Sequence, residues 1–284
     1  MNLFEAIILG IVQGLTEFLP ISSSAHLTLT GKFFGLISND TSEAWTAFMA
    51  VMQVGTLVAV VIYFYKDIKL MMTSLWKDFF TYGTMKGWKN YSTYSKLAIF
   101  IILGTIPMAI IGVGFSKVIH SMFTKSTAVI ASSLIGLALL LWLAEKIASH
   151  KRTLDKITAT DALIIGTAQA MALIPGSSRS GTTLTAGLFL NLTREAAARF
   201  SFLLSIPAVA ASGVYELSNV HGGIGGFGFV NLAAATIASG IVGYAAIAWL
   251  LRFLATNTTF SFIVYRIALG FVLFALLNFD VMQF

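Results

Sequence analysis

The sequence predicts an all-α integral membrane protein with six transmembrane helices and two re-entrant helical hairpins arranged as an inverted repeat. Hydrophobic residues make up 57% of the 284 positions and charged residues only 11%, whereas a soluble domain carries about a quarter charged residues. The mean hydropathy is +0.86. Long unbroken apolar runs such as Ala128–Ala144 favour helices over the alternating pattern of a membrane barrel. We therefore expect the bilayer to be the solvent of this chain.

The formal net charge of +6 is typical of membrane topology rather than of nucleic-acid binding. The basic residues sit in short connections between apolar runs, as the positive-inside rule describes. We expect membrane lipids around the protein and no nucleic-acid partner. Cysteine is absent, which excludes disulfides, thiolate chemistry and cysteine metal sites. The N-terminus shows neither a basic n-region nor a small-residue cleavage site, so the first helix is expected to stay in the mature protein.

Six segments are long and apolar enough to cross a hydrocarbon core of about 30 Å, at roughly 1.5 Å of rise per residue. They run approximately over Ala44–Phe64, Leu97–Phe115, Thr127–Glu145, Phe200–Leu217, Phe229–Leu251 and Phe260–Leu277.

Two further apolar stretches, Asn2–Leu36 and Asp161–Leu192, are each interrupted in the middle by a proline and a cluster of hydroxyl residues. Each half has about a dozen to seventeen residues, which is short for a full crossing. These stretches predict re-entrant helix–break–helix hairpins. Four complete crossings are the alternative.

The distribution of basic residues favours the hairpins. Two spans separate two basic connections, so both connections are expected on the cytoplasmic side. Arg194 and Arg199 belong on that side only if the second hairpin returns to the side from which it entered. Both termini, and the stretch Asn219–Gly228 without Lys or Arg, are then expected outside. The two connections contain Lys66, Lys69, Lys77, Lys86, Lys89 and Lys96, and Lys146, Lys151, Arg152 and Lys156.

The chain also repeats a motif. Gln13–Ser23 has the sequence QGLTEFLPISS, and Gln169–Ser178 has the sequence QAMALIPGSS. We expect one membrane domain whose halves cover approximately residues 1–115 and 126–284. Because the first hairpin would enter from outside and the second from inside, the halves would be inverted. Inverted repeats with broken helices place binding sites near the midplane, where the breaks meet.

The first break contains groups suited to acid–base chemistry. Gln13 and Glu17 are four residues apart and share a helical face. Pro20 disfavours helix at the preceding residue and ends the first arm. The serines that follow are good N-caps, so the second arm is expected to start near Ala25. His26 then lies in its first turn.

The second break is suited to binding an anion. Pro175 and Gly176 stop one arm, and hydroxyl residues cap the next. Both second arms therefore point their N-termini at the hairpin tips, and helix N-termini bind phosphate oxygens through free N–H groups and a positive dipole end. Arg179 adds a planar, permanently charged fork. The sequence therefore predicts an anion site inside the membrane.

Structural alternatives exist for each of these residues. Hydroxyl groups at a helix break can serve only to satisfy the carbonyls that the break frees. Glu17 and Arg179 can form a purely structural ion pair, and His26 can be a buried residue with a purely structural role. Against these alternatives, ionisable residues within a membrane are costly and usually functional. The remaining ionisable residues receive no role: His120, His150 and His221 fall in predicted loops, while Glu5, Glu216 and Arg266 are expected near span ends with side chains that reach the interface.

The two motifs, Gln13–His26 and Pro175–Thr183, resemble the signature motifs of the bacterial undecaprenyl-pyrophosphate phosphatase family, also called the bacitracin-resistance family. Chain length, motif separation and the run Phe200–Pro207 agree, so the resemblance covers nearly the whole chain. It implies six spans with two inverted re-entrant hairpins. It also implies dephosphorylation of the C55 polyprenyl pyrophosphate carrier of cell-wall synthesis in the plasma membrane, at a site that opens to the outer face.

The resemblance leads to a hypothesis for each site residue. Ser23 is the expected nucleophile, like the serine usually proposed in the family, and His26 its base or the leaving-group acid. Arg179 and the tip N–H groups are expected to clamp the pyrophosphate. Glu17, with Gln13, is expected to hold Mg²⁺ or Ca²⁺. The further substrate-binding candidates are Ser22, Ser24, Ser177, Ser178, Ser180, Gly181 and Thr182.

Three questions stay open at this stage. Family members often have glutamate where this chain has Gln13. Glutamine keeps an oxygen ligand but carries no charge, which weakens any mechanism that needs two carboxylates on one cation. A direct attack by water with His26 as base is an alternative to attack by Ser23. The sequence is compatible with a homodimer without requiring one.

Two other functions compete with hydrolysis of the pyrophosphate. A transporter or flippase for a phosphorylated lipid would also have inverted repeats and broken helices. A lipid phosphatase of the phosphatidic-acid type would need separate arginine and multiple-histidine motifs, which are missing.

Overall fold

The computed structural model describes residues 1–37, 42–83, 85–114, 126–219 and 227–279, and these residues are helical apart from connections and one isolated bridge between Arg152 and Leu192. All six expected spans are confirmed, because six helices are long and apolar enough to cross a membrane. These helices are α3 Ser42–Tyr63, α5 Thr93–Gly114, α7 Thr127–Ile147, α10 Arg194–Asn219, α11 Phe229–Thr256 and α12 Phe260–Asn278.

Two spans begin earlier than expected. Helix α5 starts at Thr93 instead of Leu97, and α10 starts at Arg194 instead of Phe200. The added turns are polar, and hydropathy detects only the apolar part of a helix. Arg199 lies in the added part of α10. Its guanidinium forms an ion pair with the Asp67 carboxylate, with a nitrogen–oxygen distance of 3.2 Å.

The lysine-rich connection after the first span is not a loop, which corrects the expectation. It contains α4 Tyr65–Tyr82 and the short η1 Met85–Asn90. Ile68, Met71 and Leu75 recur at helical spacing and pack against the main hydrophobic core. Asp78 then accepts hydrogen bonds from Ser92 N–H at 2.7 Å and from the Ser95 hydroxyl at 2.6 Å, which fastens the end of α4 to the start of α5.

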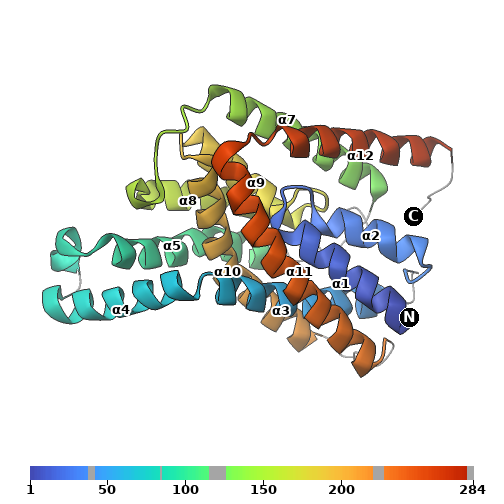
Figure 1. Cartoon of the computed structure of the whole chain (residues 1–284), viewed down its shortest axis with the longest axis horizontal. Helices are drawn as coiled ribbons and strands as arrows, with labels where there is room; N and C mark the ends of the chain where they lie inside the picture. Colours follow the sequence, from blue (N-terminus) through green and yellow to red (C-terminus); the bar gives the residue numbers. More distant parts are fainter. Residues whose placement is uncertain (38–41, 84, 115–125, 220–226, 280–284) are drawn as a thin grey trace.

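The two interrupted stretches form helix–break–helix hairpins, as expected. The first consists of α1 Leu3–Phe18 and α2 Ser23–Phe33; the second consists of α8 Ala159–Ala170, η4 Met171–Leu173 and α9 Arg179–Phe189. None of these arms reaches the length of the spans. Figure 1 shows the two tips meeting in the middle of the molecule, with α1 and α2 extending towards the N-terminal end and α8 lying on the opposite side. This arrangement is consistent with re-entrant hairpins.

Helices α5 and α8 approach closely through a pair of glycines. A Cβ atom on Gly166 of α8 would collide with the backbone of Gly104 on α5, and a Cβ atom on Gly104 would lie 2.8 Å from the carbonyl oxygen of Ala162. Lipid tails are as apolar as leucine, so helices in a membrane associate through close packing and hydrogen bonds, and small residues allow that packing. The glycines therefore hold the second hairpin against the six-helix scaffold.

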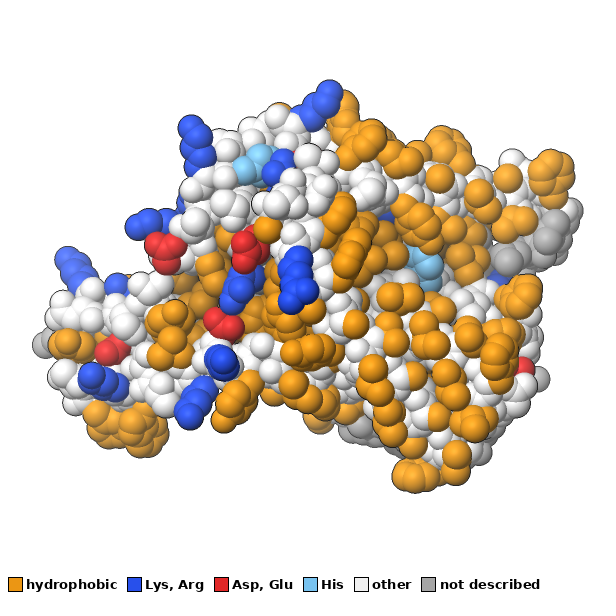
Figure 2. Space-filling model, in the orientation of Figure 1, with side chains coloured by type: hydrophobic (Ala, Val, Ile, Leu, Met, Phe, Trp, Pro, Cys, Tyr) orange, Lys and Arg blue, Asp and Glu red, His pale blue; other side chains and the backbone are white. Residues whose placement is uncertain are grey.

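Ion pairs fasten the base of the second hairpin. Arg152 donates to the Asp161 carboxylate at 2.5 and 3.1 Å and to the Leu190 carbonyl at 2.9 Å, which joins the start of α8 to the end of α9. The hydrogen bond with Asp161 raises the pKa of Arg152 above its ordinary value. Arg194 pairs with Glu145 on α7. Figure 2 shows most of the visible Lys and Arg side chains gathered at the end of the molecule that holds α4 and the α7–α8 connection.

We predict that Gly166→Val lowers the thermal unfolding midpoint of the purified protein in detergent, at a cost of about 1–3 kcal/mol from overpacking. The matched control is Gly112→Val on α5, since a Cβ atom at Gly112 would meet no heavy atom within 4 Å. Equal midpoints for the two variants would contradict the proposed role of the glycine contact.

Candidate active site

The serine at the end of each break has nearly the same backbone conformation. Ser22 has φ 78° and ψ 98°, and Ser178 has φ 69° and ψ 109°. Each serine caps the helix that follows, accepting from the N–H of Ala25 at 3.4 Å and of Gly181 at 3.1 Å. Positive φ at a residue other than glycine costs about 1–3 kcal/mol and persists only where the surroundings impose it. The second arm of the first hairpin thus begins at Ser23, two residues earlier than expected.

The hydroxyl groups next to the caps repeat as well. Ser22 and Ser24 share a hydrogen bond of 3.1 Å, and Ser178 and Ser180 share one of 3.2 Å. Ser23 and Arg179 consequently occupy equivalent positions, each as the first residue of a second arm.

Three contacts join one tip to the other. Arg179 forms an ion pair with Glu17. The Ser180 hydroxyl donates to the Leu19 carbonyl at 2.9 Å, and the Gly176 N–H donates to the Ser24 hydroxyl at 3.3 Å. The breaks therefore form one unit, as the sequence predicted from their motifs.

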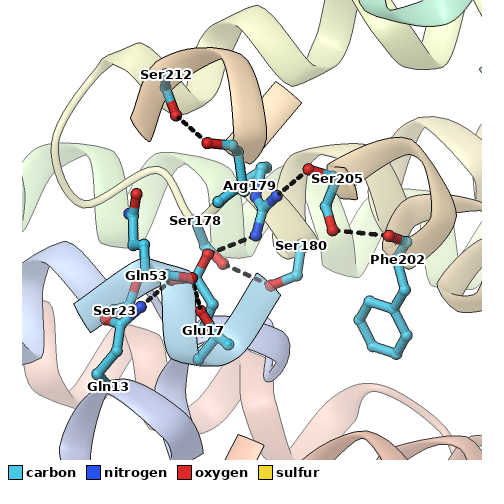
Figure 3. A network of polar contacts seen from close by, with 12 residues as sticks. Gln13, Glu17, Ser23, Gln53, Ser178, Arg179, Ser180, Phe202, Ser205 and Ser212 are labelled. Atoms are coloured by element: carbon cyan, nitrogen blue, oxygen red, sulfur yellow. Dashed lines mark hydrogen bonds and ion pairs between the residues drawn. The ribbon is translucent and has the colours of Figure 1, made fainter. Parts of the chain in front are cut away.

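The Glu17 carboxylate lies at the centre of this unit (Figure 3). One of its oxygens accepts from Gln13 Nε2 at 3.0 Å and from Ser23 Oγ at 2.7 Å, and the other pairs with Arg179. The expected common face of Gln13 and Glu17 is confirmed. Arg179 also donates to the Ser205 carbonyl of α10 at 3.4 Å. The side chains of Glu17 and Arg179 are only 5% and 13% exposed, so their charges are held away from water.

A cavity of about 270 Å³ opens beside Glu17. Most of its polar lining comes from the hairpins, and most of its apolar lining comes from α3, α5 and α10, with Met49, Met108 and Val209 among its residues. A polar end next to an apolar wall fits a ligand with an anionic head and a hydrocarbon tail. The polar wall comprises Gln13, Glu17, Ser22, Ser23, Ser24, Ser178 and Arg179, together with Thr46, Gln53 and Ser212.

His26 lies elsewhere in the structure. Its Nδ1 is 2.7 Å from the Ser22 carbonyl oxygen, and its Nε2 is 2.5 Å from the Tyr265 hydroxyl. Because a carbonyl only accepts, Nδ1 carries a proton, and Nε2 shares a hydrogen bond with the Tyr265 hydroxyl. Among the hydrogen bonds of the described residues none joins His26 to Ser23, and His26 does not line the cavity. The structure thus pairs Ser23 with Glu17 instead of the expected histidine.

Four of the predicted substrate-binding residues lie in or next to the second tip but do not line the cavity. Ser177 is buried, and its hydroxyl has no hydrogen-bond partner among the described residues. Ser180 bonds to the first tip, and Thr182 donates to the Arg179 carbonyl at 3.0 Å within α9. Gly181 faces the guanidinium of Arg266.

Two residues near the site were missed by the sequence reasoning. Gln53 lines the cavity from α3, and an amide in an otherwise apolar span was the signal for it. Arg266 was expected to reach the membrane interface, which is wrong: it is 0% exposed. Its side chain turns inward because it binds carbonyls of both hairpin breaks. A charge inside a predicted span was the available signal.

The residues beside Glu17 fit a divalent cation in part. The Gln13 Oε1 atom is buried and has no hydrogen-bond partner among the described residues, so an oxygen ligand is free next to the Glu17 carboxylate. Mg²⁺ is usually held by one or two carboxylates, water and substrate phosphates. No group of three His, Cys, Asp or Glu side chains suited to a metal forms in the described part of the chain. Such a cation would therefore take its other ligands from the substrate and water.

Comparison with known proteins agrees with the resemblance of the two motifs. A family model described as "Bacitracin resistance protein BacA" matches residues 6–272. The chain is 50% identical to a protein of Syntrophobacter fumaroxidans named undecaprenyl-diphosphatase, over 95% of both chains. It is 49% identical to one of that name from Chloroherpeton thalassium, over 98% of both chains, and 48% identical to one from Myxococcus xanthus, over 98% of this chain and 90% of the relative. The chain belongs to the bacitracin resistance protein BacA family.

Proposed function

We propose that this protein hydrolyses undecaprenyl pyrophosphate to undecaprenyl phosphate and inorganic phosphate, which returns the lipid carrier to cell-wall synthesis. The observation that carries the proposal is the cluster of Ser23, Glu17 and Arg179 between two helix N-termini, beside a cavity with one apolar wall. The names of the three relatives support the same reaction.

Binding of the substrate would start with an exchange of partners at Arg179. The N-termini of α2 and α9 offer free N–H groups and positive dipole ends to phosphate oxygens. Arg179, the first residue of α9, is held by Glu17 in the structure. When the guanidinium turns to the pyrophosphate, the Glu17 carboxylate loses this partner, and the oxygen that Arg179 occupied becomes free.

The chemical step follows from the contact between Ser23 and Glu17. The Ser23 oxygen attacks the terminal phosphorus while its proton passes to the Glu17 carboxylate at the 2.7 Å hydrogen bond. The bond from this phosphorus to the bridging oxygen breaks, and undecaprenyl phosphate leaves. Water then attacks the phosphoserine phosphorus, the bond from phosphorus to the Ser23 oxygen breaks, and inorganic phosphate leaves while Ser23 takes its proton back from Glu17. Direct attack by a water molecule, with His26 as base, remains the competing mechanism.

A divalent cation, Mg²⁺ or Ca²⁺, fits this site as part of the proposal. Gln13 Oε1 and the Glu17 carboxylate would hold it, and Arg179 would hold the phosphate oxygens on the other side. When bound, such an ion neutralises the charge that accumulates on the pyrophosphate during phosphoryl transfer.

The protein is a multi-pass membrane protein, and we place its site towards the outer face of the plasma membrane. The gathering of basic side chains at the end of the molecule opposite the N-terminus supports this orientation. A homodimer stays a prediction.

Phosphate release by purified protein tests the proposed function. Wild type should release inorganic phosphate from undecaprenyl pyrophosphate, and a chelator should lower the rate. Ser23→Ala should lower the rate at least about a hundredfold if Ser23 is the nucleophile. The control Ser126→Ala changes a serine whose side chain makes no cap hydrogen bond to α7 and should behave like wild type. Movement of intact lipid without phosphate release would favour a flippase instead.

Gln13→Glu should leave the protein active and lower the metal concentration for half-maximal activity at least about threefold, because a second carboxylate joins Glu17 beside a hard cation. Gln169→Glu is the control. Gln169 lies at the equivalent position of the second motif, and it is buried but does not line the cavity. An unchanged metal requirement together with a raised KM would show that residue 13 faces the substrate phosphate, and the assigned metal role would fail.

The proposed orientation predicts labelling from opposite sides, and the absence of native cysteine makes the test clean. A cysteine introduced at Ser38, which lies outside the described residues, should react with an impermeant maleimide from the periplasmic or external side. A cysteine at the exposed Lys151 should react only from the cytoplasm. The reverse pattern would overturn the orientation.

A further inference from the structure

Arg266 is a fully buried cation bound only to backbone. It lies on α12 with 0% exposure. Its guanidinium donates to the Pro20 carbonyl of the first break at 3.3 Å, and to the Gly176 and Ser177 carbonyls of the second break at 3.3 and 3.0 Å. It also reaches the Ser133 and Leu134 carbonyls of α7, at 3.5 and 3.3 Å. One side chain thus joins three segments of the protein.

These carbonyls need a donor from outside their own segments. Pro20, Gly176 and Ser177 lie between the arms of their hairpins, where the helical hydrogen-bond ladder is interrupted. An unsatisfied carbonyl in the membrane costs several kcal/mol. A guanidinium has five donors in one rigid plane, whereas an ammonium concentrates its donors at a single point. Arginine can therefore serve both breaks at once.

The burial of Arg266 is not explained by an ion pair. None of the ion pairs among the described residues includes it. A charge within a membrane span is costly, and such residues usually serve the function of the protein. The carbonyl oxygens offset part of that cost, and all three tip carbonyls lie within two residues of a serine that lines the cavity, Ser22 or Ser178.

Two neighbouring features tie α12 to the site. A Cβ atom on Gly181, in the first turn of α9, would lie 2.6 Å from Arg266 Nη1, so α9 starts directly against the guanidinium. The preceding residue, Tyr265, bonds to His26 on α2. Consecutive residues of α12 therefore contact the second arms of both hairpins.

We infer that Arg266 is a positioning residue of the proposed reaction. By binding the carbonyls of both breaks, it holds the two tips in register, so that Ser23 on one tip and Arg179 on the other face the same pyrophosphate. It does not line the cavity, and it acts through the tips. The inference rests on the proposed function for its kinetic consequence, while the register of the tips is a structural property that can be measured separately.

The kinetic test compares Arg266→Lys, Arg179→Lys and the double variant. Arg266→Lys keeps the charge and should lower kcat at least about tenfold with KM within about threefold of wild type, because the cavity lining is unchanged. Arg179→Lys should remove most activity, since an ammonium cannot replace the bidentate fork. If Arg266 acts through the placement of Arg179, adding Arg266→Lys to Arg179→Lys should cost less than about threefold more.

Two further variants complete the kinetic test. Arg252→Lys, at an exposed arginine of α11, is the control and should match wild type. Gly181→Ala keeps Arg266 but presses a methyl group against its Nη1 atom, so it should reproduce the loss of kcat even if Arg266→Lys folds poorly. Wild-type kcat in Arg266→Lys, or losses that multiply fully in the double variant, would overturn the inference.

A distance measurement tests the register without relying on activity. Spin labels at Ile7 on α1 and Leu163 on α8, which are 38% and 40% exposed, report the spacing of the two hairpins. Arg266→Lys should broaden or shift the distance distribution, while Arg252→Lys should not. An unchanged distribution in Arg266→Lys would overturn the positioning role. Absence of phosphate release by wild type would instead overturn the proposed function.

Discussion

The backbone of the two hairpin breaks has to find all its hydrogen-bond partners inside the protein, because lipid offers none. Several contacts around the two breaks meet this requirement. Ser22 and Ser178 cap the second arms from strained positive-φ conformations, Ser180 donates to the Leu19 carbonyl of the opposite tip, and Arg266 collects carbonyls from both breaks. With the carbonyls engaged on the side of α12, the helix N-termini are left to face the cavity. The same constraint therefore stabilises the fold and shapes the proposed anion site.

The ion pair between Glu17 and Arg179 gives the site a resting state without excess charge. A guanidinium or carboxylate alone would be costly at this depth, and each offsets the other. The pair also links substrate binding to the carboxylate, because a pyrophosphate that attracts Arg179 frees one oxygen of Glu17, while its other oxygen is bonded to Ser23. In the proposed mechanism the substrate itself therefore frees the carboxylate that takes the Ser23 proton.

The two motifs share a backbone but differ in chemistry. Equivalent first positions of the second arms carry Ser23 in one hairpin and Arg179 in the other, so in the proposed mechanism one tip supplies the nucleophile and the other binds the phosphate. Three positions further on, the first hairpin has His26 and the second has Thr182. Neither of these side chains points into the cavity, since His26 binds Tyr265 and Thr182 binds its own helix. A symmetric scaffold thus surrounds an asymmetric site.

The sequence alone determined the membrane class, the six spans, both breaks, and the common helical face of Gln13 and Glu17, because hydropathy and the helical period act over a few residues. It missed α4, whose apolar stripe is narrow and mixed with lysines, and it assigned Arg266 to the interface because hydropathy does not report the direction of a side chain. Only the tertiary structure decided that Ser23 bonds to Glu17 and that His26 bonds to Tyr265, 239 residues away. It also decided that Arg266 binds Pro20, 246 residues away. Contacts of this range depend on how helices cross, and no local pattern in the chain encodes that geometry.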